Sequence, residues 1–319
     1  MTEVPEPRPG RLARFLDALW AGEEDATALG LARVALVTVF TLSLLSHVGA
    51  VGEYFSDESV IAGEHARLAF KSRWSLFFWF PDPTAVRALF AVGVVAHLMW
   101  LVGLYTRISA VVATAIWLSM VGRNPLLYAM PDQMHTNLLF LLALMPSGNA
   151  VSLDAMRRGG GKPVPIWCRR ILQLQVAAIY AKTGLLKTGV TWSDGTALYF
   201  SLANPYNRHF DMPGVIAALQ PYVLRPATHL VRLWEVAFAM FTAVLWLREM
   251  TGRRFFPDVR KWFLGFGVLM HLGILATMYV AWFTPLALAS YTAFMRPDEA
   301  RRVIVRFARR RPAEQGVTP

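Results

Sequence analysis

Long apolar stretches dominate the hydrophobic pattern of this chain and predict helices that cross a membrane. A spanning helix needs about 20 mostly apolar residues, and the pattern contains five such segments. They are residues 30–48, 85–105, 166–186, 230–247 and 262–283. Shorter apolar runs occupy residues 108–121, 134–145 and 284–295. We therefore predict an all-α fold, a polytopic transmembrane helix bundle of about eight spans, with seven spans as the alternative.

The positions of the basic residues predict the orientation of this bundle. With eight spans and a cytoplasmic N-terminus, most of the 32 Lys and Arg residues fall in cytoplasmic segments, as the positive-inside rule requires. If Pro285 instead kinked one long seventh helix, the basic tail after residue 295 would lie outside, which the same rule disfavours. We therefore predict eight spans with both termini in the cytoplasm.

Composition narrows the class of protein further. Apolar residues make up 55% and charged residues 17% of the 319 positions, with a mean hydropathy of +0.40, whereas soluble domains carry about 25% charged residues. The net charge of +11 would suit nucleic acid, but the cytoplasmic loops of a membrane protein explain it as well, so we expect no nucleic-acid partner. The single cysteine, Cys168, excludes an internal disulfide and a CxxC redox pair.

Amphipathic segments are predicted at both ends of the chain. Residues 1–29 show no cleavable signal peptide but carry a helical apolar stripe suited to a membrane surface, with a soluble helix packed on the core as the alternative. The stripe is formed by Leu12, Phe15, Leu16, Leu19 and Trp20. Residues 296–319 form a basic tail predicted to bind anionic lipid headgroups. The apolar side of its helix is formed by Val303, Ile304 and Phe307. Residues 30–295 between these ends are predicted to be one transmembrane domain.

Ionisable residues inside the predicted spans are candidates for function, because the bilayer makes an unpaired charge costly. They are Lys182, Lys187, Glu235, His97 and His271. Structural alternatives remain open for three of them. Lys187 can anchor at the lipid headgroups, Glu235 can form an ion pair with an unidentified partner, and His271 can hydrogen-bond a neighbouring helix.

The fifth predicted span carries two polar stripes. Helical spacing places Gln173, Tyr180 and Lys187 on one stripe, at i, i+7 and i+14. Gln175 and Lys182 form the other stripe on a different side of the helix. We therefore expect this helix to lie at the centre of the bundle rather than against lipid.

Further polar residues reach the predicted outer face of the membrane together with Lys187. At about 1.5 Å per residue, Lys187 lies roughly 31 Å from the inner end of its span. The third, fourth and fifth spans place donors, acceptors and an aromatic ring at the same depth. These residues are Arg123, Asn124, Asp132, His135, Trp192 and Asp194. We predict that they converge with Lys187 and Glu235 on one outward-facing site.

Motifs for the common cofactors are missing from the sequence. The seven histidines are never closer than 18 residues, so no local HxxH, HxxxH or HExxH spacing exists and we expect no metal site. No GxSxG elbow, P-loop or GxGxxG motif occurs either. The remaining possibilities are a cofactor-poor enzyme, a carrier or a maturation factor.

Aromatic residues concentrate in the long first outer loop. They are Phe70, Trp74, Phe77, Phe78, Trp79 and Phe80, just before Pro81. They are typical of an aromatic belt at the headgroups, and the alternative is an entrance for a lipophilic quinone.

Several segments resemble a known family. The central ones are residues 173–180, 184–187 and 192–199, and others in the same order are 103–107, 123–124, 132–137, 152–155, Glu235 and 271–274. Together they resemble the HTTM family, the membrane domain of vitamin K-dependent gamma-carboxylases and their bacterial relatives. The resemblance extends over residues 31–295 and is most specific around Lys187.

The resemblance implies an activity and a site. Lys187 matches the base that deprotonates a reduced vitamin K-type naphthoquinone, whose reaction with O2 drives removal of a glutamate gamma proton and addition of CO2. His135 and His271 match further family histidines, with Gln173, Tyr180 and Glu235 in the surrounding pocket. It also implies no metal and a multi-pass protein of the bacterial cytoplasmic membrane, with membrane lipids and a secreted peptide or protein as partners.

Departures from the family pattern leave other functions open. Animal carboxylases carry a large lumenal region after the membrane domain and a pair of lysines in the signature, whereas here a short basic tail follows Met295 and Lys187 stands alone. One alternative is a non-enzymatic maturation or export factor for a secreted peptide, or a protein that binds a lipid or quinone. A proton-coupled transporter that uses Lys182, Lys187 and Glu235 is a third class, although no inverted repeat supports it.

Overall fold

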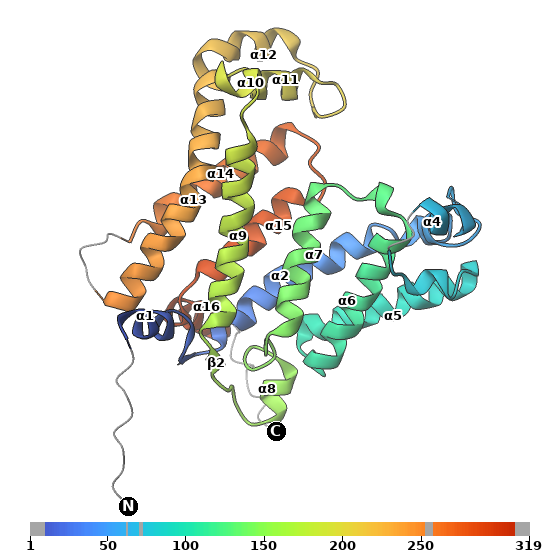
Figure 1. Ribbon diagram of the computed structural model, residues 1–319, viewed down its shortest axis with the longest axis vertical. Helices are drawn as coiled ribbons and strands as arrows, with labels where there is room; N and C mark the ends of the chain where they lie inside the picture. Colours follow the sequence, from blue (N-terminus) through green and yellow to red (C-terminus); the bar gives the residue numbers. More distant parts are fainter. Residues whose placement is uncertain (1–9, 62, 70–72, 253–257, 310–319) are drawn as a thin grey trace, which may run out of the picture. The chain divides into compact units, whose positions relative to one another are not determined.

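The computed structural model is mostly helical and describes residues 10–61, 63–69, 73–252 and 258–309 (Figure 1). The chain forms two compact units. Unit 1 contains Met1–Glu23 and Pro165–Leu288, and unit 2 contains Glu24–Val164 and Ala289–Pro319. The two-residue strands β1 (Glu23–Glu24) and β2 (Val164–Pro165) mark two of the points where the chain passes between the units.

Unit 1 is built on a pair of long helices that lie side by side, α9 (Trp167–Leu186) and α13 (Arg225–Thr251) (Figure 1). Its other elements are α1 (Arg11–Trp20), α10 (Val190–Ser193), α11 (Ala197–Ala203), α12 (Pro213–Leu219), the π-helical turn η4 (Gln220–Leu224) and α14 (Arg260–Thr277). Apolar and aromatic side chains such as Val176, Trp234 and Phe238 fill the contact between α9 and α13.

Unit 2 packs four main helices around a buried aromatic and aliphatic core. They are α2 (Thr27–Leu45), α5 (Pro83–Val102), α6 (Thr106–Arg123) and α7 (Met130–Leu144). Its shorter helices are η1 (Val48–Ala50), α3 (Val51–Phe55), α4 (Gly63–Ala69), η2 (Leu76–Phe78), η3 (Pro125–Leu127), α8 (Leu153–Arg157), η5 (Tyr291–Phe294) and α16 (Pro297–Arg309). Leu36, Phe40, Trp100, Trp117 and Leu138 are buried at its centre.

Clear local signals set the bounds of α5. Asp82 accepts hydrogen bonds from the backbone amides of Thr84 and Ala85 at 2.8 and 3.1 Å, and Pro83 occupies the first helical position, both of which favour a helix start. The helix ends at Gly103, whose φ of 72° suits a residue without a side chain. The predicted span 85–105 is therefore confirmed as a helix, with both bounds shifted by two or three residues.

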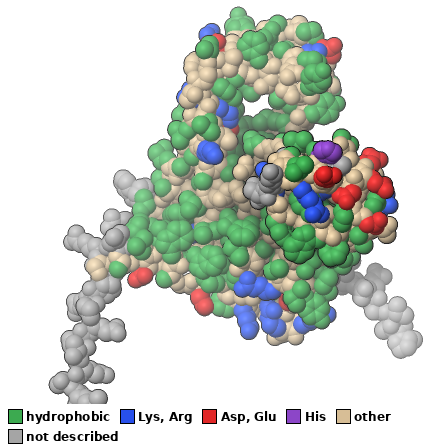
Figure 2. All heavy atoms as spheres, turned by 45° about the vertical axis from the view of Figure 1, so that its right-hand side comes forward, with side chains coloured by type: hydrophobic (Ala, Val, Ile, Leu, Met, Phe, Trp, Pro, Cys, Tyr) green, Lys and Arg blue, Asp and Glu red, His purple; other side chains and the backbone are tan. Residues whose placement is uncertain are grey.

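Each of the eight predicted apolar segments is helical for most of its length. Within the described residues, the helical stretches Thr27–Phe55, Pro83–Val102 and Pro213–Thr251 are long and apolar enough to cross a membrane. Exposed apolar side chains cover broad areas of the surface (green in Figure 2), as expected where lipid replaces water. The structure thus supports a helical membrane protein, while the number of spans stays a prediction.

The prediction for residues 262–283 placed the helix end too late. α14 ends at Thr277, and Met278 instead pairs with Arg208 in an isolated antiparallel bridge. Ala281 has a φ of 45°, a left-handed conformation that interrupts a right-handed helix. A separate helix, α15 (Phe283–Ser290), then passes from unit 1 into unit 2. The chain is therefore broken before Pro285, and one long kinked helix is not formed.

The amphipathic and aromatic segments are partly buried. In α1, Phe15 and Leu16 are exposed while Leu19 is buried. α16 packs on α2, and Arg301 pairs with Asp25 at 2.6 Å. In the aromatic loop, Trp74, Trp79 and Phe80 are exposed, whereas Phe77 and Phe78 belong to the core of unit 2. The side chains of Leu12 and Phe307, and residue Phe70, lie outside the described part of the chain.

Candidate functional site

Lys187 lies at the end of α9 in a cluster with a carboxylate and an indole ring. Its Nζ forms an ion pair with Glu235 of α13 and lies 5.0 Å from the ring centroid of Trp192. Glu235 is buried and Lys187 is half-buried. The sequence left the ion-pair partner of Glu235 unidentified. The structure shows that this partner is Lys187, the residue that the family resemblance matches to the base. We call Lys187, Glu235 and Trp192 the lysine cluster.

A glycine brings the two helices together beside the lysine cluster. A Cβ atom at Gly184 would lie 2.8 Å from the backbone nitrogen of Val236 and 2.9 Å from Cβ of Glu235. Atoms essentially never approach a Cβ this closely, so the helix spacing requires glycine at this position. Gly184 is three residues before Lys187, and it therefore sets the distance across which Lys187 and Glu235 meet.

Replacing Gly184 with alanine is expected to separate α9 from α13 locally and to destabilise the protein by about 1–3 kcal/mol, the usual cost of overpacking. Thermal unfolding of the purified protein, followed by tryptophan fluorescence, measures the loss. Gly273→Ala is the matched control, because a Cβ at Gly273 in α14 would meet nothing within 4 Å. Equal stability of the two variants would contradict the role assigned to Gly184.

Tyr180 and His271 form a second pair, deeper along α9. The Tyr180 hydroxyl and Nε2 of His271 are 2.7 Å apart. The Tyr180 ring stacks on Phe238 at a centroid distance of 4.7 Å, and both Tyr180 and His271 are buried. The predicted alternative for His271, a hydrogen bond between helices, is thus present in the structure.

Gln173 completes a ladder of polar contacts along one face of α9. Its side-chain oxygen accepts a 2.6 Å hydrogen bond from Nε1 of Trp246 on α13. Gln173, Tyr180 and Lys187 therefore share one inward face, as their spacing predicts. The second polar stripe differs, because Lys182 is exposed and Gln175 is half-buried. The expectation that both stripes lie inside the bundle is wrong for Lys182.

Asp194 organises the turn after α10. Its carboxylate accepts hydrogen bonds from the hydroxyl and the backbone amide of Thr196, at 2.6 and 2.9 Å. The hydroxyl hydrogen bond from Thr196 is the main cause that lowers the pKa of Asp194, against the effect of desolvation and with help from Arg225. Gly195 has a φ of 80° in the same turn. Asp194 thus acts as a turn residue that holds the segment carrying Trp192.

His135 belongs to unit 2 and lies between two aromatic rings. It stacks on Phe40 and Trp117, with centroid distances of 4.3 and 3.7 Å. Its Nε2 is buried and has no hydrogen-bond partner among the described residues. This histidine is therefore held in place by packing between two rings.

The other predicted site residues of unit 2 bind the chain itself. Arg123 donates hydrogen bonds to the carbonyl oxygen of Ile61 and the hydroxyl of Ser59, both at 2.9 Å, and also to the carbonyl oxygen of Ser56. Asn124 donates to the carbonyl oxygen of Tyr54 at 3.2 Å. Asp132 accepts from the backbone amide of Ala129 at 2.9 Å, at the start of α7. These contacts fix the loop after α3 and cap a helix, and the pocket roles predicted for the three residues stay predictions.

Several residues of the site were not predicted from the sequence. Trp246, Phe238 and Gly184 contact or position the predicted residues, yet nothing in the local pattern of α13 distinguishes its tryptophan and phenylalanine from ordinary core residues. Gly184 did carry a signal, since a glycine inside a helical pattern often marks a close helix contact. Within the described residues, no group of three or more His, Cys, Asp or Glu side chains is placed to hold a metal ion.

Comparison with known proteins gives one match. No curated protein and no solved structure matches the chain. A family model described as the HTTM domain matches residues 22–298, a range that includes the lysine cluster, the Tyr180–His271 pair and His135. Because that match covers nearly the whole chain, the protein belongs to the HTTM domain family.

Proposed function

We propose that this protein is a multi-pass enzyme of the bacterial cytoplasmic membrane that oxidises a reduced naphthoquinone at an outward-facing site, with Lys187 as the base. The observation that carries the proposal is the lysine cluster: a half-buried amine in contact with a buried carboxylate and an aromatic ring. The HTTM domain is associated with vitamin K-dependent carboxylase-type membrane proteins, which is the chemistry that such a base serves.

The residues of the lysine cluster fit a quinol. An aromatic diol presents a flat apolar ring and a hydroxyl proton, and Trp192 offers a stacking surface next to the amine of Lys187. Leu185, Leu186 and Val190 beside them are exposed and apolar. These side chains provide an apolar approach from the lipid phase to the amine.

Each protein group has a defined task in this proposal. Lys187 accepts the hydroxyl proton and must be neutral to do so, and Glu235 is in direct contact to take the proton that Lys187 carries beforehand. The bound quinol, in reaction with O2, supplies the strong base needed to remove a glutamate gamma proton before CO2 adds. Tyr180 lies seven residues before Lys187, about 10 Å along the helix. Because this distance separates Tyr180 and His271 from the amine of Lys187, we assign them a positioning role.

Contacts within each unit support the proposed topology. In unit 2, Asp154 of one predicted cytoplasmic loop binds the backbone amides of Tyr105 and Thr106 in another. In unit 1, Arg169 pairs with Glu249 at 3.2 Å, again between predicted cytoplasmic ends. Segments assigned to the same side of the membrane thus meet, as the proposed topology requires.

The test uses the purified full-length protein in lipid nanodiscs with a reduced naphthoquinone, O2, labelled bicarbonate and a glutamate-containing peptide. We expect quinone epoxide, detected by mass spectrometry, and label incorporated into the peptide. Quinone binding without epoxide would favour the alternative, a non-enzymatic maturation or quinone-binding protein. If the protein neither binds the quinone nor forms the epoxide, the proposal is overturned.

A further inference from the structure

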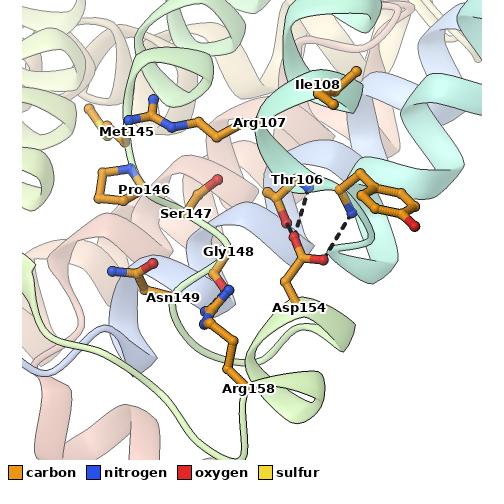
Figure 3. A pocket seen from close by; sticks show the side chains of 11 residues that line it. Thr106, Arg107, Ile108, Met145, Pro146, Ser147, Gly148, Asn149, Asp154 and Arg158 are labelled. Carbon is orange, nitrogen blue, oxygen red and sulfur yellow. Dashed lines mark hydrogen bonds between the residues drawn. The ribbon is translucent and has the colours of Figure 1, made fainter.

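Unit 2 contains a pocket of about 340 Å³ where α6 begins and α7 ends (Figure 3). Its wall is formed by the first residues of α6, the segment after α7 and the short helix α8. The pocket belongs to unit 2 and the lysine cluster to unit 1, and the pocket contains none of the residues assigned to the proposed reaction. Its location corresponds to the predicted cytoplasmic side of the membrane.

Two arginines line this pocket, with Ser147 and Gly148 between them (Figure 3). Arg107 donates a hydrogen bond to the carbonyl oxygen of Leu144 at 3.0 Å, and Arg158 donates one to the carbonyl oxygen of Gly148 at 3.1 Å. Both are exposed, and neither forms a salt bridge with a described carboxylate. A guanidinium has five N–H donors, so both arginines keep donors for a ligand.

The one acidic side chain of the lining faces two arginines and uses both of its oxygens at the start of α6. Both oxygens of Asp154 accept hydrogen bonds at the start of α6, from the amides of Tyr105 and Thr106 and from the Thr106 hydroxyl at 2.6 Å. Burial raises the pKa of Asp154, but these hydrogen bonds and Arg158 outweigh it and hold the pKa below its usual value. Asp154 is therefore an ionised cap of α6, and the pocket keeps a net positive charge.

The loop that forms the floor of the pocket is held rigidly. The buried Arg33 donates hydrogen bonds to the carbonyl oxygens of Ser147, at 2.7 Å, and Val151. Val151 has a φ of 52°, which is rare for a β-branched residue and persists only where surrounding contacts enforce it. Such imposed strain is typical of binding sites, because it fixes the groups that meet the ligand.

Apolar side chains are exposed on the two helices that meet at the pocket. Ile108 and Val111 are exposed on α6, and Phe140 and Leu144 are exposed on α7. Ile108 lines the pocket and the carbonyl oxygen of Leu144 accepts the hydrogen bond from Arg107, so both helices expose apolar side chains next to the two arginines. A ligand with a negative head and an apolar tail matches this arrangement of charge and apolar area.

We propose that this pocket binds the phosphate headgroup of an anionic glycerophospholipid between Arg107 and Arg158, with its acyl chains along α6 and α7. Arginine is well suited to a phosphate, because its planar N–H groups donate two parallel hydrogen bonds. Basic pockets between helices on the cytoplasmic side commonly take anionic lipid headgroups. The exposed apolar side chains beside the pocket favour a lipid over a free phosphate ion. This inference does not depend on the proposed reaction.

Native mass spectrometry of the full-length protein, with phosphatidylglycerol, phosphatidylcholine or glycerol phosphate added, tests the proposal. We expect the protein to retain phosphatidylglycerol roughly tenfold more strongly than phosphatidylcholine or glycerol phosphate. The double variant Arg107→Gln, Arg158→Gln is expected to lose this preference. Arg87→Gln is the matched control, because Arg87 of α5 is also exposed and does not line the pocket.

Asn149→Asp provides a second variant that keeps the arginines and the side-chain shape while adding a negative charge to the pocket lining. It is expected to weaken phosphatidylglycerol binding as well. Equal retention of the two lipids, or an unchanged preference in both variants, would overturn the proposal. Glycerol phosphate that binds as strongly as phosphatidylglycerol would overturn the lipid assignment and indicate a phosphate site.

Discussion

Lys187→Ala is expected to abolish quinone epoxide formation and CO2 incorporation by the purified protein. The substitution removes the amine in contact with Glu235 and next to Trp192, and no other amine belongs to this cluster. Loss of a positioned general base typically costs roughly 10²–10⁴-fold in rate. Turnover with the reduced naphthoquinone, compared between variant and unaltered protein in the same nanodiscs, measures the effect.

Two further variants separate proton transfer from structure. Lys187→Arg keeps a positive charge beside Glu235 but cannot accept a proton, because a guanidinium stays protonated, so we expect loss of activity with the thermal midpoint retained. Lys182→Ala removes an exposed lysine of the same helix and is expected to leave turnover unchanged. An active Lys187→Arg protein would refute the assignment of Lys187 as the base.

The apolar runs predict most of the helices because a run of apolar residues has few other ways to satisfy its backbone in a membrane. Where the predicted bounds fail, a distant contact decides. The end of α14 is set by the pairing of Met278 with Arg208, two residues that no local pattern connects. The short helices between α9 and α13 also escape prediction, since turns such as the one at Asp194 and Gly195 shape them.

Helical periodicity predicts which residues of the candidate site share one face of α9. Spacing places Gln173, Tyr180 and Lys187 on one face of α9, and the structure pairs each of them with α13 or α14. Periodicity gives angles around one helix and does not identify the neighbouring helix. The contact of Lys187 with Glu235, and the exposure of Lys182, therefore required the fold. The contacts of Arg123 with Ile61 and of Asp132 with Ala129 likewise follow from the fold and not from periodicity.

Arg33→Met is expected to produce the largest loss of stability among the substitutions considered, about 3–6 kcal/mol for two charged hydrogen bonds. Arg33 is fully buried in α2 and donates to the carbonyl oxygens of Ser147 and Val151, which lie more than 110 residues later in the chain. Methionine fills most of the volume but removes the donors of both carbonyl oxygens, and each charged hydrogen bond is worth about 1.5–3 kcal/mol. The strained backbone at Val151 then loses a contact that maintains it.

Thermal unfolding in detergent, followed by tryptophan fluorescence, is expected to show a midpoint lowered by on the order of 10 °C for Arg33→Met. Arg302→Met removes an exposed arginine with one surface ion pair, which costs at most about 1 kcal/mol, and serves as the control. Arg33→Lys keeps the charge but reaches the two carbonyl oxygens less well than a guanidinium, so an intermediate midpoint is expected. If Arg33→Met and Arg302→Met unfold at the same temperature, Arg33 does not hold the 147–151 loop. If the midpoint falls while phosphatidylglycerol retention is unchanged, Arg33 stabilises unit 2 without shaping the pocket lined by Arg107 and Arg158.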